Sequence, residues 1–561
     1  MPEKRIYRDD RLNAAPSAHL VPDYVNGVLT GLRLDGLFVP RPVLGVEHEN
    51  NLAARLPSWE RQTPDTVGVE ACLQAAASLG AKPARGCFSR CDRGLYDRGR
   101  LILPGPQGLP IHCYDDLFKF EIALGEFTSA KRLLAVEEAL LPVLREIAAR
   151  AERILAEHYR ADTHLLLHRS GGDGDTTCAA VHLNIPWADA VSHAAYVSLE
   201  AFDHLQETLV RQMAIMTSVA AVGMPGDDGM LSDPRSRSFR HIVGCSTLEP
   251  SRAMQFNRLQ ARSGEGYERQ GCGRNMGMCA AWGQSQAANL ISLVLNQLET
   301  LRLHLAVAGL YAPPRLVHAD DNLLTLAAEL ATNRRRAMEL QRRALDDYAR
   351  FTSFLAAEVG PEVLQELVPD VEEALRLADT VLTAMEHGDQ DTVVRHTDYG
   401  KKMLLVDEYL SGRAGGWRDN LTGIRNICFA FASPQALSPY YSHFRSKGLE
   451  ALVLADEDVR AAGPDPCTRS YFFSRIVRDF WEDPLREFLE FDWDRLVLRQ
   501  SSTWSGGWVP KIHTRENTIR LAGSVGHNAP AVANVFDTQI SSLEDVFDIF
   551  GAAQPAETAE V

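Results

Sequence analysis

Apolar and polar side chains alternate over residues 118–124, within the stretch 113–128. The apolar positions are Phe118, Phe120, Ile122 and Leu124, and the residues between them are Lys119, Glu121 and Ala123. A period of two is typical of a half-buried β-strand, which holds its polar side chains above one face of a sheet. The acidic residues of this stretch are Asp115 or Asp116 at its start, Glu121 midway and Glu126 directly after Gly125. We therefore predict a strand with an acidic face.

A second acidic strand is predicted near the start of the chain. Residues 43–50 read Val-Leu-Gly-Val-Glu-His-Glu-Asn. Glu47 and Glu49 are two residues apart, so on a strand both side chains lie on the same face. Two acidic residues on a strand are also common on solvated surfaces, which is the alternative interpretation of this pair.

Longer segments have the spacing of amphipathic helices. Residues 130–159 carry apolar side chains at the helical period, from Leu133 to Leu155. Further helices are predicted around residues 67–79, over 197–222 and through most of 284–410. Strands are predicted over 163–168 and 181–185, and in the second of these His182 and Asn184 share the polar face. Residues 223–283 are rich in glycine, arginine and methionine without a long period, which predicts irregular chain.

These elements predict an α+β fold. We expect a curved, largely antiparallel sheet with the acidic side chains on one face and helices packed on the other. The composition changes after the sequence Gly-Arg-Ala-Gly-Gly at residues 412–416. We accordingly predict an N-terminal extension (1–40), a main domain (41–416), a small α+β C-terminal domain (417–536) and a C-terminal tail (537–561).

Composition narrows the classes of function. The chain has 561 residues, of which 45% are hydrophobic and 24% charged, which is ordinary for a globular protein of two or three domains. Its formal net charge of -16 argues against general nucleic-acid binding, because a phosphate partner needs a basic surface. No signal peptide and no uninterrupted apolar run long enough for a bilayer is recognisable. The ten cysteines lack the paired spacing of a zinc site, so we expect reduced cysteines in a cytoplasmic protein.

The acidic residues of the two strands predict a divalent-metal site. Carboxylates that converge above a sheet repel one another unless a cation lies among them. Glu47 and Glu49 supply oxygen ligands from one strand, and Glu121 and Glu126 supply them from the other. His182 beside such a group is a candidate metal or phosphate contact. A solvated strand face and a buried structural histidine are the alternatives.

Two further segments contain residues suited to phosphate. Residues 169–177 form a glycine-rich turn that includes Asp173, although the pattern matches neither a P-loop nor a dinucleotide fingerprint. The irregular segment 223–283 contains Arg252 and Arg258. A guanidinium group binds phosphate or carboxylate through two parallel hydrogen bonds and is always charged. A plain surface loop and solvated arginines are the alternatives.

Taken together, these motifs resemble the Pup ligase and depupylase family, the proteasome accessory factors among the glutamine-synthetase-like carboxylate–amine ligases. Residues 45–49 are similar to the family's Gly-x-Glu-x-Glu strand, whose glutamates hold magnesium and ATP. Residues 114–116 with Glu121 and Glu126 are similar to its Tyr-x-Asp…Pro-Glu…Glu segment, which places the catalytic aspartate on Asp116. Strand parity instead places Asp115 on the face of Glu121, so Asp115 is the second candidate.

Other segments extend the resemblance to about residue 498. Asp173, His182 and Asn184 match an Asn-Asn-Thr-Asp…His-Glu-Asn segment. Arg252 and Arg258 keep the spacing of two family arginines, residues 396–402 resemble an Asp-Trp-x-x-Lys helix, and Arg469 ends a Pro-x-x-Thr-Arg turn. Two segments depart from the family. Residues 269–278 lack its Arg-x-His-Val-Ile-x-Gly-Asp-x-Asn strand, and its Asp-x-x-Tyr-His falls on Cys428, Phe431 and Ala432.

The resemblance implies an ATP- and magnesium-dependent ligase that joins a carboxylate to an amine, with a small protein modifier or a protein lysine among the candidate substrates. The metal ligands would be Glu47, Glu49, Glu121 and Glu126, the catalytic residue Asp116 or Asp115, and the nucleotide- or substrate-binding residues Asp173, His182, Asn184, Arg252, Arg258 and Arg469. One alternative is depupylase-type hydrolysis of an amide or isopeptide, with the nucleotide as a bound cofactor. The other is a non-catalytic relative that binds a protein partner.

Overall fold

The computed structural model describes residues 19–21, 31–34, 37–55, 65–84, 100–116, 119–169, 181–185, 187–188, 198–232, 241–244, 253–256, 272–273, 277–280, 283–318, 321–433, 439–466, 468–483, 489–491, 495–499 and 516–520. The tail predicted over 537–561 and Phe118 of the predicted acidic strand lie outside these residues. Every helix, strand and pairing given below belongs to these residues.

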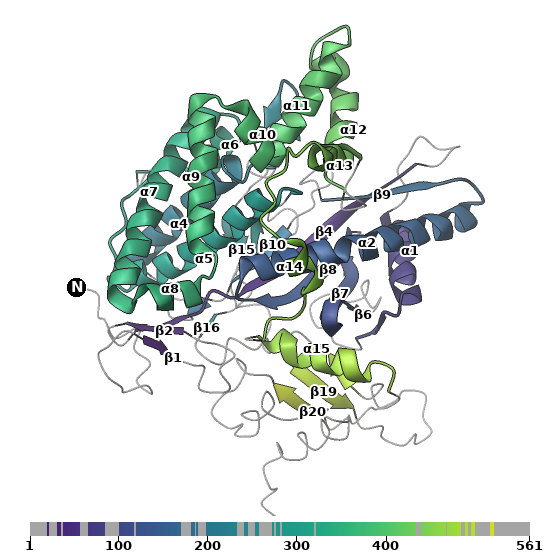
Figure 1. The fold of residues 1–561 in the computed structure, drawn as a ribbon, viewed down its shortest axis with the longest axis horizontal. Helices are drawn as coiled ribbons and strands as arrows, with labels where there is room; N and C mark the ends of the chain where they lie inside the picture. The colour runs from purple at the N-terminus through teal and green to yellow at the C-terminus, as the bar shows by residue number, and fades with distance from the viewer. Residues whose placement is uncertain are drawn as a thin grey trace, which may run out of the picture.

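A ten-stranded sheet lies at the centre of the described chain (Figure 1). Nine strands follow one another across it: β14 (His241–Gly244), β15 (Ala253–Phe256), β17 (Gly277–Ala280), β10 (Val181–Asn184), β4 (Leu44–Arg55), β8 (Lys119–Phe127), β7 (Pro110–Asp116), β6 (Leu101–Pro104) and β5 (Lys82–Pro83). The tenth, β9 (His164–His168), pairs with the second half of β4. The described pairs are antiparallel except for β14 with β15. The α+β fold with a largely antiparallel sheet is thereby confirmed.

Two helices cover one face of this sheet. Helix α1 (Asp65–Ser78) packs on β7 and β8, and helix α2 (Ala130–Tyr159) packs on α1 and β8. The bounds of α2 are those that the hydrophobic period predicts, because Ser129 caps its first turn and Arg160 ends it in the left-handed conformation. Apolar side chains of β8, including Phe120 and Ile122, are buried in one core with those of α2. The opposite face of β8 is thus left to its polar residues.

A helical bundle lies beside the sheet (Figure 1). Its helices are α4 (Leu199–Thr217), α5 (Gln286–Val307), α6 (Leu323–Leu330), α7 (Arg334–Val359), α8 (Pro361–Leu367), α9 (Val371–His387), α10 (Gln390–His396) and α11 (Asp398–Ser411). By length and composition α5 could cross a membrane, but 94% of its apolar window is buried in the protein. Helix α5 contacts α2, α4 and α9 and is therefore the core helix that joins the bundle to the sheet layer.

The chain after residue 416 packs against both parts. Its helices are α12 (Leu421–Phe431), α13 (Pro439–Ser446), α14 (Asp456–Arg460) and α15 (Arg469–Phe480), followed by a small sheet of β18 (Leu489–Phe491), β19 (Arg495–Arg499) and β20 (Glu516–Arg520). Phe431 and Tyr441 are buried with Leu405 of α11. Ser470 Oγ accepts a hydrogen bond from the Glu126 amide at 2.8 Å, and Asp465 accepts one from the Thr128 amide at 2.7 Å. These bonds fix α15 at the end of β8, while the domain boundary at 416 stays a prediction.

The short strands fall in segments of weak periodicity. Strands β1 (His19–Val21), β2 (Gly31–Leu34) and β3 (Leu37–Pro40) form one small sheet, β11 (Trp187–Ala188) pairs with β16 (Cys272–Gly273), and β12 (Met224–Pro225) pairs with β13 (Met230–Leu231). The prediction of irregular chain over 223–283 was therefore wrong where β12 to β17 lie. The stretch 113–128 holds two strands, β7 and β8, that pair with each other. A strand continuous from Cys113 was therefore wrong, whereas the alternative of a strand that begins only near Leu117 agrees with β8.

Candidate functional site

The acidic side chains lie on the face of the sheet opposite α1 and α2, which we call the acidic face. Cross-strand pairs place its residues in four rows. The rows are Asn184–Gly45–Glu126, His182–Glu47–Ala123–His112, Glu49–Glu121–Tyr114 and Lys119–Asp116. Directly opposed residues point to the same side of a sheet, so side chains from β10, β4, β8 and β7 converge here. The two predicted acidic strands are thus direct neighbours.

The register decides between the two candidate aspartates. Asp116 pairs with Lys119, which is two residues from Glu121 and therefore on its face, whereas Asp115 pairs with Phe120 of the apolar core. The parity argument for Asp115 assumed one continuous strand. Strand β7 ends at Asp116 and β8 begins at Lys119, and the two strands are antiparallel. The alternation of faces along β8 therefore cannot be extended back into β7. The structure places Asp116 on the acidic face and Asp115 on the opposite one.

Glu126 reaches the acidic face through a β-bulge. Glu121 and Glu126 are an odd number of residues apart, so a regular strand would place them on opposite faces. The pairing shifts between Gly45–Glu126 and Glu47–Ala123, so that two residues of β8 face one of β4. The extra residue returns Glu126 to the face of Glu47. A Cβ atom at Gly125, in the bulge, would lie 2.5 Å from Ser470 Oγ, so the close approach of α15 requires glycine there.

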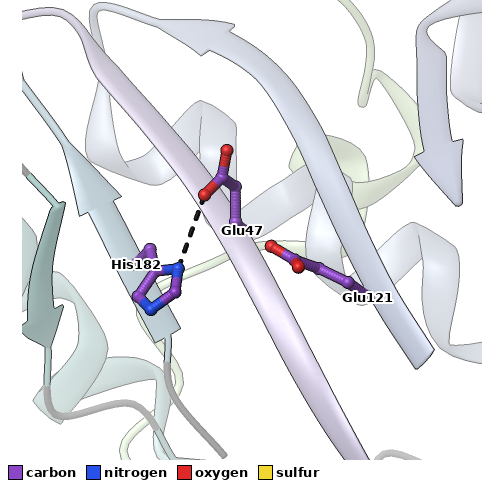
Figure 2. A group of neighbouring side chains, drawn as sticks. All are labelled: Glu47, Glu121 and His182. Carbon is purple, nitrogen blue, oxygen red and sulfur yellow. Dashed lines mark ion pairs between the residues drawn. The ribbon is translucent and has the colours of Figure 1, made fainter. Parts of the chain in front are cut away.

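Among the residues that the structure describes, two groups of side chains could each hold a metal ion. Ligand atoms of Glu47, Glu121 and His182 lie within 4.8 Å of one another, and so do those of Glu49, Asp116 and Glu121. Figure 2 shows the first group, in which the three side chains come from β4, β8 and β10 and point toward one another. His182 Nδ1 lies 3.5 Å from Glu47 Oε2, and His182 Nε2 lies 3.7 Å from Glu49 Oε1. Glu121 belongs to both groups, which makes it the central residue of the site.

Burial and mutual repulsion raise the proton affinity of the carboxylates on this face, whereas burial lowers that of the neighbouring His112. Burial and the charge of Glu49 raise the pKa of Asp116 to about 6, against the opposing effect of Lys119. Burial, Asp116 and Glu47 raise the pKa of Glu121 well above its ordinary value, although Tyr114 donates a hydrogen bond to it. Burial lowers the pKa of His112 well below its ordinary value, and Arg100 lowers it further. The carboxylates therefore carry electrostatic strain that a bound cation would relieve.

The sequence interpretation missed three residues of this face. Lys119 Nζ lies 2.7 Å from Glu49 Oε2, and Tyr114 and His112 extend the rows on β7. All three positions follow from strand period once β7 and β8 are known to pair as a hairpin. The sequence did not reveal where the turn between β7 and β8 lies. Without that turn, these three residues could not be assigned to the acidic face, although their residue types are compatible with it.

A charged triad supports β4 from behind. His48 lies between Glu47 and Glu49 but points to the helix side, where it pairs with Glu137 of α2. Arg169, directly after β9, lies 3.1 Å from the same carboxylate. Burial would raise the pKa of Glu137, but the charges of His48 and Arg169 lower it to about 2. The triad fixes the strand that carries Glu47 and Glu49 against α2.

The remaining predicted residues are only partly described. Asn184 lies at the end of β10, opposite Gly45 and one row from His182. Asp173, Arg252 and Arg258 lie outside the described residues. Arg469 is the first residue of α15, next to Ser470, and its backbone alone is described. The structure thus brings together the metal candidates and Asp116, with His182 and Asn184 beside them.

The donor set of the acidic face fits a divalent cation. Carboxylate oxygens are the ligands that Mg²⁺ and Mn²⁺ prefer in proteins, and the two groups supply Glu47, Glu49, Asp116 and Glu121. Glu47, Glu49 and Glu121 are each less than 5% exposed, so water screens their repulsion poorly. Chemistry, spacing and burial all favour a bound metal ion over a solvated strand face.

We expect the stabilisation by Mg²⁺ to depend on pH. Because the pKa of Asp116 is raised, the folded protein keeps a proton that the unfolded chain has already lost. The metal-free protein is therefore more stable at low pH and loses this contribution to its stability as the pH rises through about 6. Mg²⁺ needs the ionised carboxylates, so its binding strengthens over the same range. At a hundredfold excess over Kd, Mg²⁺ should add about 2.7 kcal/mol near pH 8 and far less near pH 5. Thermal unfolding with and without MgCl₂ measures this, and an equal gain at both pH values would contradict it.

Comparison with known proteins agrees with this geometry. A family model described as Pup-ligase protein matches residues 280–497. The crystal structure of the complex between the prokaryotic ubiquitin-like protein Pup and its ligase PafA has a TM-score of 0.63 at 15% identity, and the match covers 93% of this chain and 99% of that one. PafA in complex with ADP has a TM-score of 0.58 at 15% identity, with 89% and 96% covered. Residues 280–497 thus match the Pup ligase family model, and the chain has the fold of PafA. No curated protein sequence matches it significantly.

The match to the family model does not reach the acidic face. The family model spans α5 to α15, whereas the residues of the acidic face lie between positions 45 and 184, outside that match. Cys428, Phe431 and Ala432 stand where the family motif has Asp, Tyr and His. They lie on α12 and directly after it, and all three side chains are buried. Phe431 and Cys428 belong to apolar clusters that join α12 to neighbouring helices. Apolar packing thus occupies positions that are polar in the family motif.

Proposed function

We propose that the chain is an ATP- and Mg²⁺-dependent ligase that forms an amide or isopeptide bond between a carboxylate and an amine. The observation that supports it most is the convergence of buried carboxylates from β4, β7 and β8 on one face of a sheet with the Pup ligase fold. A fold alone does not define a reaction, so the proposal depends on these side chains.

The chemistry explains why such a site needs both nucleotide and cation. A carboxylate is a poor acyl donor at neutral pH. Attack of its oxygen on the γ-phosphorus of ATP releases ADP and gives an acyl phosphate. The amine nitrogen then attacks the carbonyl carbon, phosphate leaves, and the nitrogen loses a proton. Each step moves negative charge between oxygens, which positioned positive charge stabilises.

The residues of the acidic face have distinct roles in this proposal. Glu47, Glu49, Glu121 and His182 would hold Mg²⁺, which when bound neutralises the nucleotide phosphates. Asp116 is half-buried at the edge of the group, and its pKa of about 6 leaves it ionised at neutral pH. It would accept the proton of the incoming amine. Asn184, Glu126, Asp173, Arg252, Arg258 and Arg469 are proposed to contact the metal, nucleotide or substrate carboxylate.

The solved relatives suggest the class of substrate. One of them is PafA bound to Pup, a protein modifier, and the other is PafA bound to ADP. We therefore propose a small protein modifier as the carboxylate donor and a protein lysine as the amine. Pup itself is the probe with which to begin.

A conjugation assay tests the proposal. The protein is incubated with ATP, MgCl₂, Pup and a lysine-containing acceptor, and both ADP release and covalent product are measured. We expect product only with all components, and Asp116→Asn should lower its rate by at least about 10²-fold while nucleotide still binds. Asp115→Asn is the matched control, because its position is on the opposite face.

The alternatives have separate outcomes in the same assay. Cleavage of a Pup–protein conjugate without net ATP consumption would identify a hydrolase of the depupylase type. Absence of nucleotide binding to a folded protein would leave a protein-binding relative. An equal loss of rate in Asp115→Asn and Asp116→Asn would contradict the role given to Asp116.

A further inference from the structure

A lysine lies among the carboxylates of the acidic face. Lys119 Nζ is 2.7 Å from Glu49 Oε2, a hydrogen-bonded ion pair. The Glu49 side chain is 3% exposed and that of Lys119 is 18% exposed, so the ammonium group lies at the solvent side of the carboxylate. Lys119 is also the cross-strand neighbour of Asp116. The positive charge of Lys119 therefore lies beside the ligand group formed by Glu49, Asp116 and Glu121.

The two ligand groups are too close to be independent. Both include Glu121, and the ligand atoms within each lie within 4.8 Å of one another. Two metal ions that share a carboxylate lie about 3.5–4 Å apart. The Lys119 ammonium group lies at the position formed by Glu49, Asp116 and Glu121. There it neutralises part of the carboxylate charge and repels a divalent ion. The pair between Lys119 and Glu49 is therefore an obstacle to a second ion.

We infer that Lys119 takes the place of a second metal ion in this chain. The inference rests on the proposed function and refines it. Glu47, Glu121 and His182 hold the one ion, while Glu49 is also paired with Lys119. One divalent ion then binds per chain, and Lys119 supplies positive charge at Glu49, Asp116 and Glu121. An ammonium group donates three hydrogen bonds, so the bond to Glu49 leaves two for an anionic group such as a phosphate. Its partial exposure makes it accessible to such a ligand.

Counting bound Mn²⁺ tests this inference without any activity measurement. Mn²⁺ titration of the full chain, followed by electron paramagnetic resonance, gives the number of ions and their magnetic coupling. We expect one tightly bound ion in the wild type. Lys119→Met should bind two, with the second affinity raised at least tenfold and a coupled two-ion signal. Lys119→Arg keeps the charge and should still bind one.

The controls separate this inference from the proposed function. Lys131 pairs with Glu373 at 2.5 Å on helices α2 and α9, and Lys131→Met should leave the count at one. Lys119→Gln provides a second uncharged variant if Lys119→Met does not fold. Two ions in the wild type, or one in both uncharged variants, would overturn the inference and leave the ligase proposal intact. Absence of Mn²⁺ binding to the folded wild type would overturn both.

Discussion

Replacing Glu121 with glutamine is expected to abolish metal binding and, with it, any ATP-dependent activity. Glu121 contributes to both ligand groups, so its loss removes an oxygen ligand from each. We expect activity to fall about 10²- to 10³-fold, the size of effect seen when one central electrostatic contact of an active site is removed. Mn²⁺ titration and the conjugation assay measure the two losses.

The same substitution should stabilise the metal-free protein near neutral pH. Burial and the neighbouring carboxylates raise the pKa of Glu121, which means that its ionised form is unfavourable in the folded state. Glutamine keeps the shape without the charge, so the metal-free Tm should rise while the increase produced by Mg²⁺ disappears. Glu146→Gln, at an exposed pair with Arg150 on α2, serves as the control and should change neither. A variant that still binds Mn²⁺ as the wild type does would show that the acidic face is not the metal site.

Local sequence pattern predicted the elements that hold this site. The apolar period over residues 130–159 predicted α2 correctly at both ends, because spacing and caps agree there. Strand β4 was predicted from residues 43–50, and the two-residue spacing of Glu47 and Glu49 correctly placed both side chains on one face. Such features depend on neighbours within a few residues, so a single sequence contains the information.

The convergence of the two acidic strands beside His182 was predicted, but the exact register, the bulge and the partner of Lys119 were not, because they depend on contacts between distant segments. The pairing of His182 with Glu47 and of Glu121 with Glu49 is set by sheet register, which no single strand specifies. The bulge at Gly125 exists where α15 approaches β8, more than 300 residues later in the chain. Lys119 was assigned only as a polar strand position, because its partner Glu49 lies on another strand. Tertiary packing, and not residue type, decides these positions.

Glu299→Gln is expected to destabilise the helical bundle more than any substitution on the acidic face. Glu299 of α5 lies in a network of side chains that are fully buried. It accepts hydrogen bonds from Arg302 Nε at 2.7 Å and from the Tyr348 hydroxyl at 3.1 Å, and Arg211 pairs with Asp347 at 3.1 Å beside it. Among the fully buried members of this network, two guanidinium groups balance two carboxylates, while the exposed Arg350 pairs with Asp347 from the surface at 3.5 Å. Neutralising Glu299 leaves one buried guanidinium uncompensated, at a cost of about 3–5 kcal/mol.

Two further variants show whether charge balance is the cause. Removing Glu299 and Arg302 together, as Glu299→Leu with Arg302→Met, restores neutrality and should cost less than the sum of the two single substitutions. On the surface, Arg342 of α7 pairs with Glu386 of α9 at 2.8 Å, and Arg342→Met should cost less than about 1 kcal/mol because water screens that pair. Thermal unfolding of the full chain compares all of them. If Glu299→Gln unfolded at the temperature of Arg342→Met, the buried network would contribute no more than a surface ion pair, and apolar packing around α5 alone would account for the stability of the bundle.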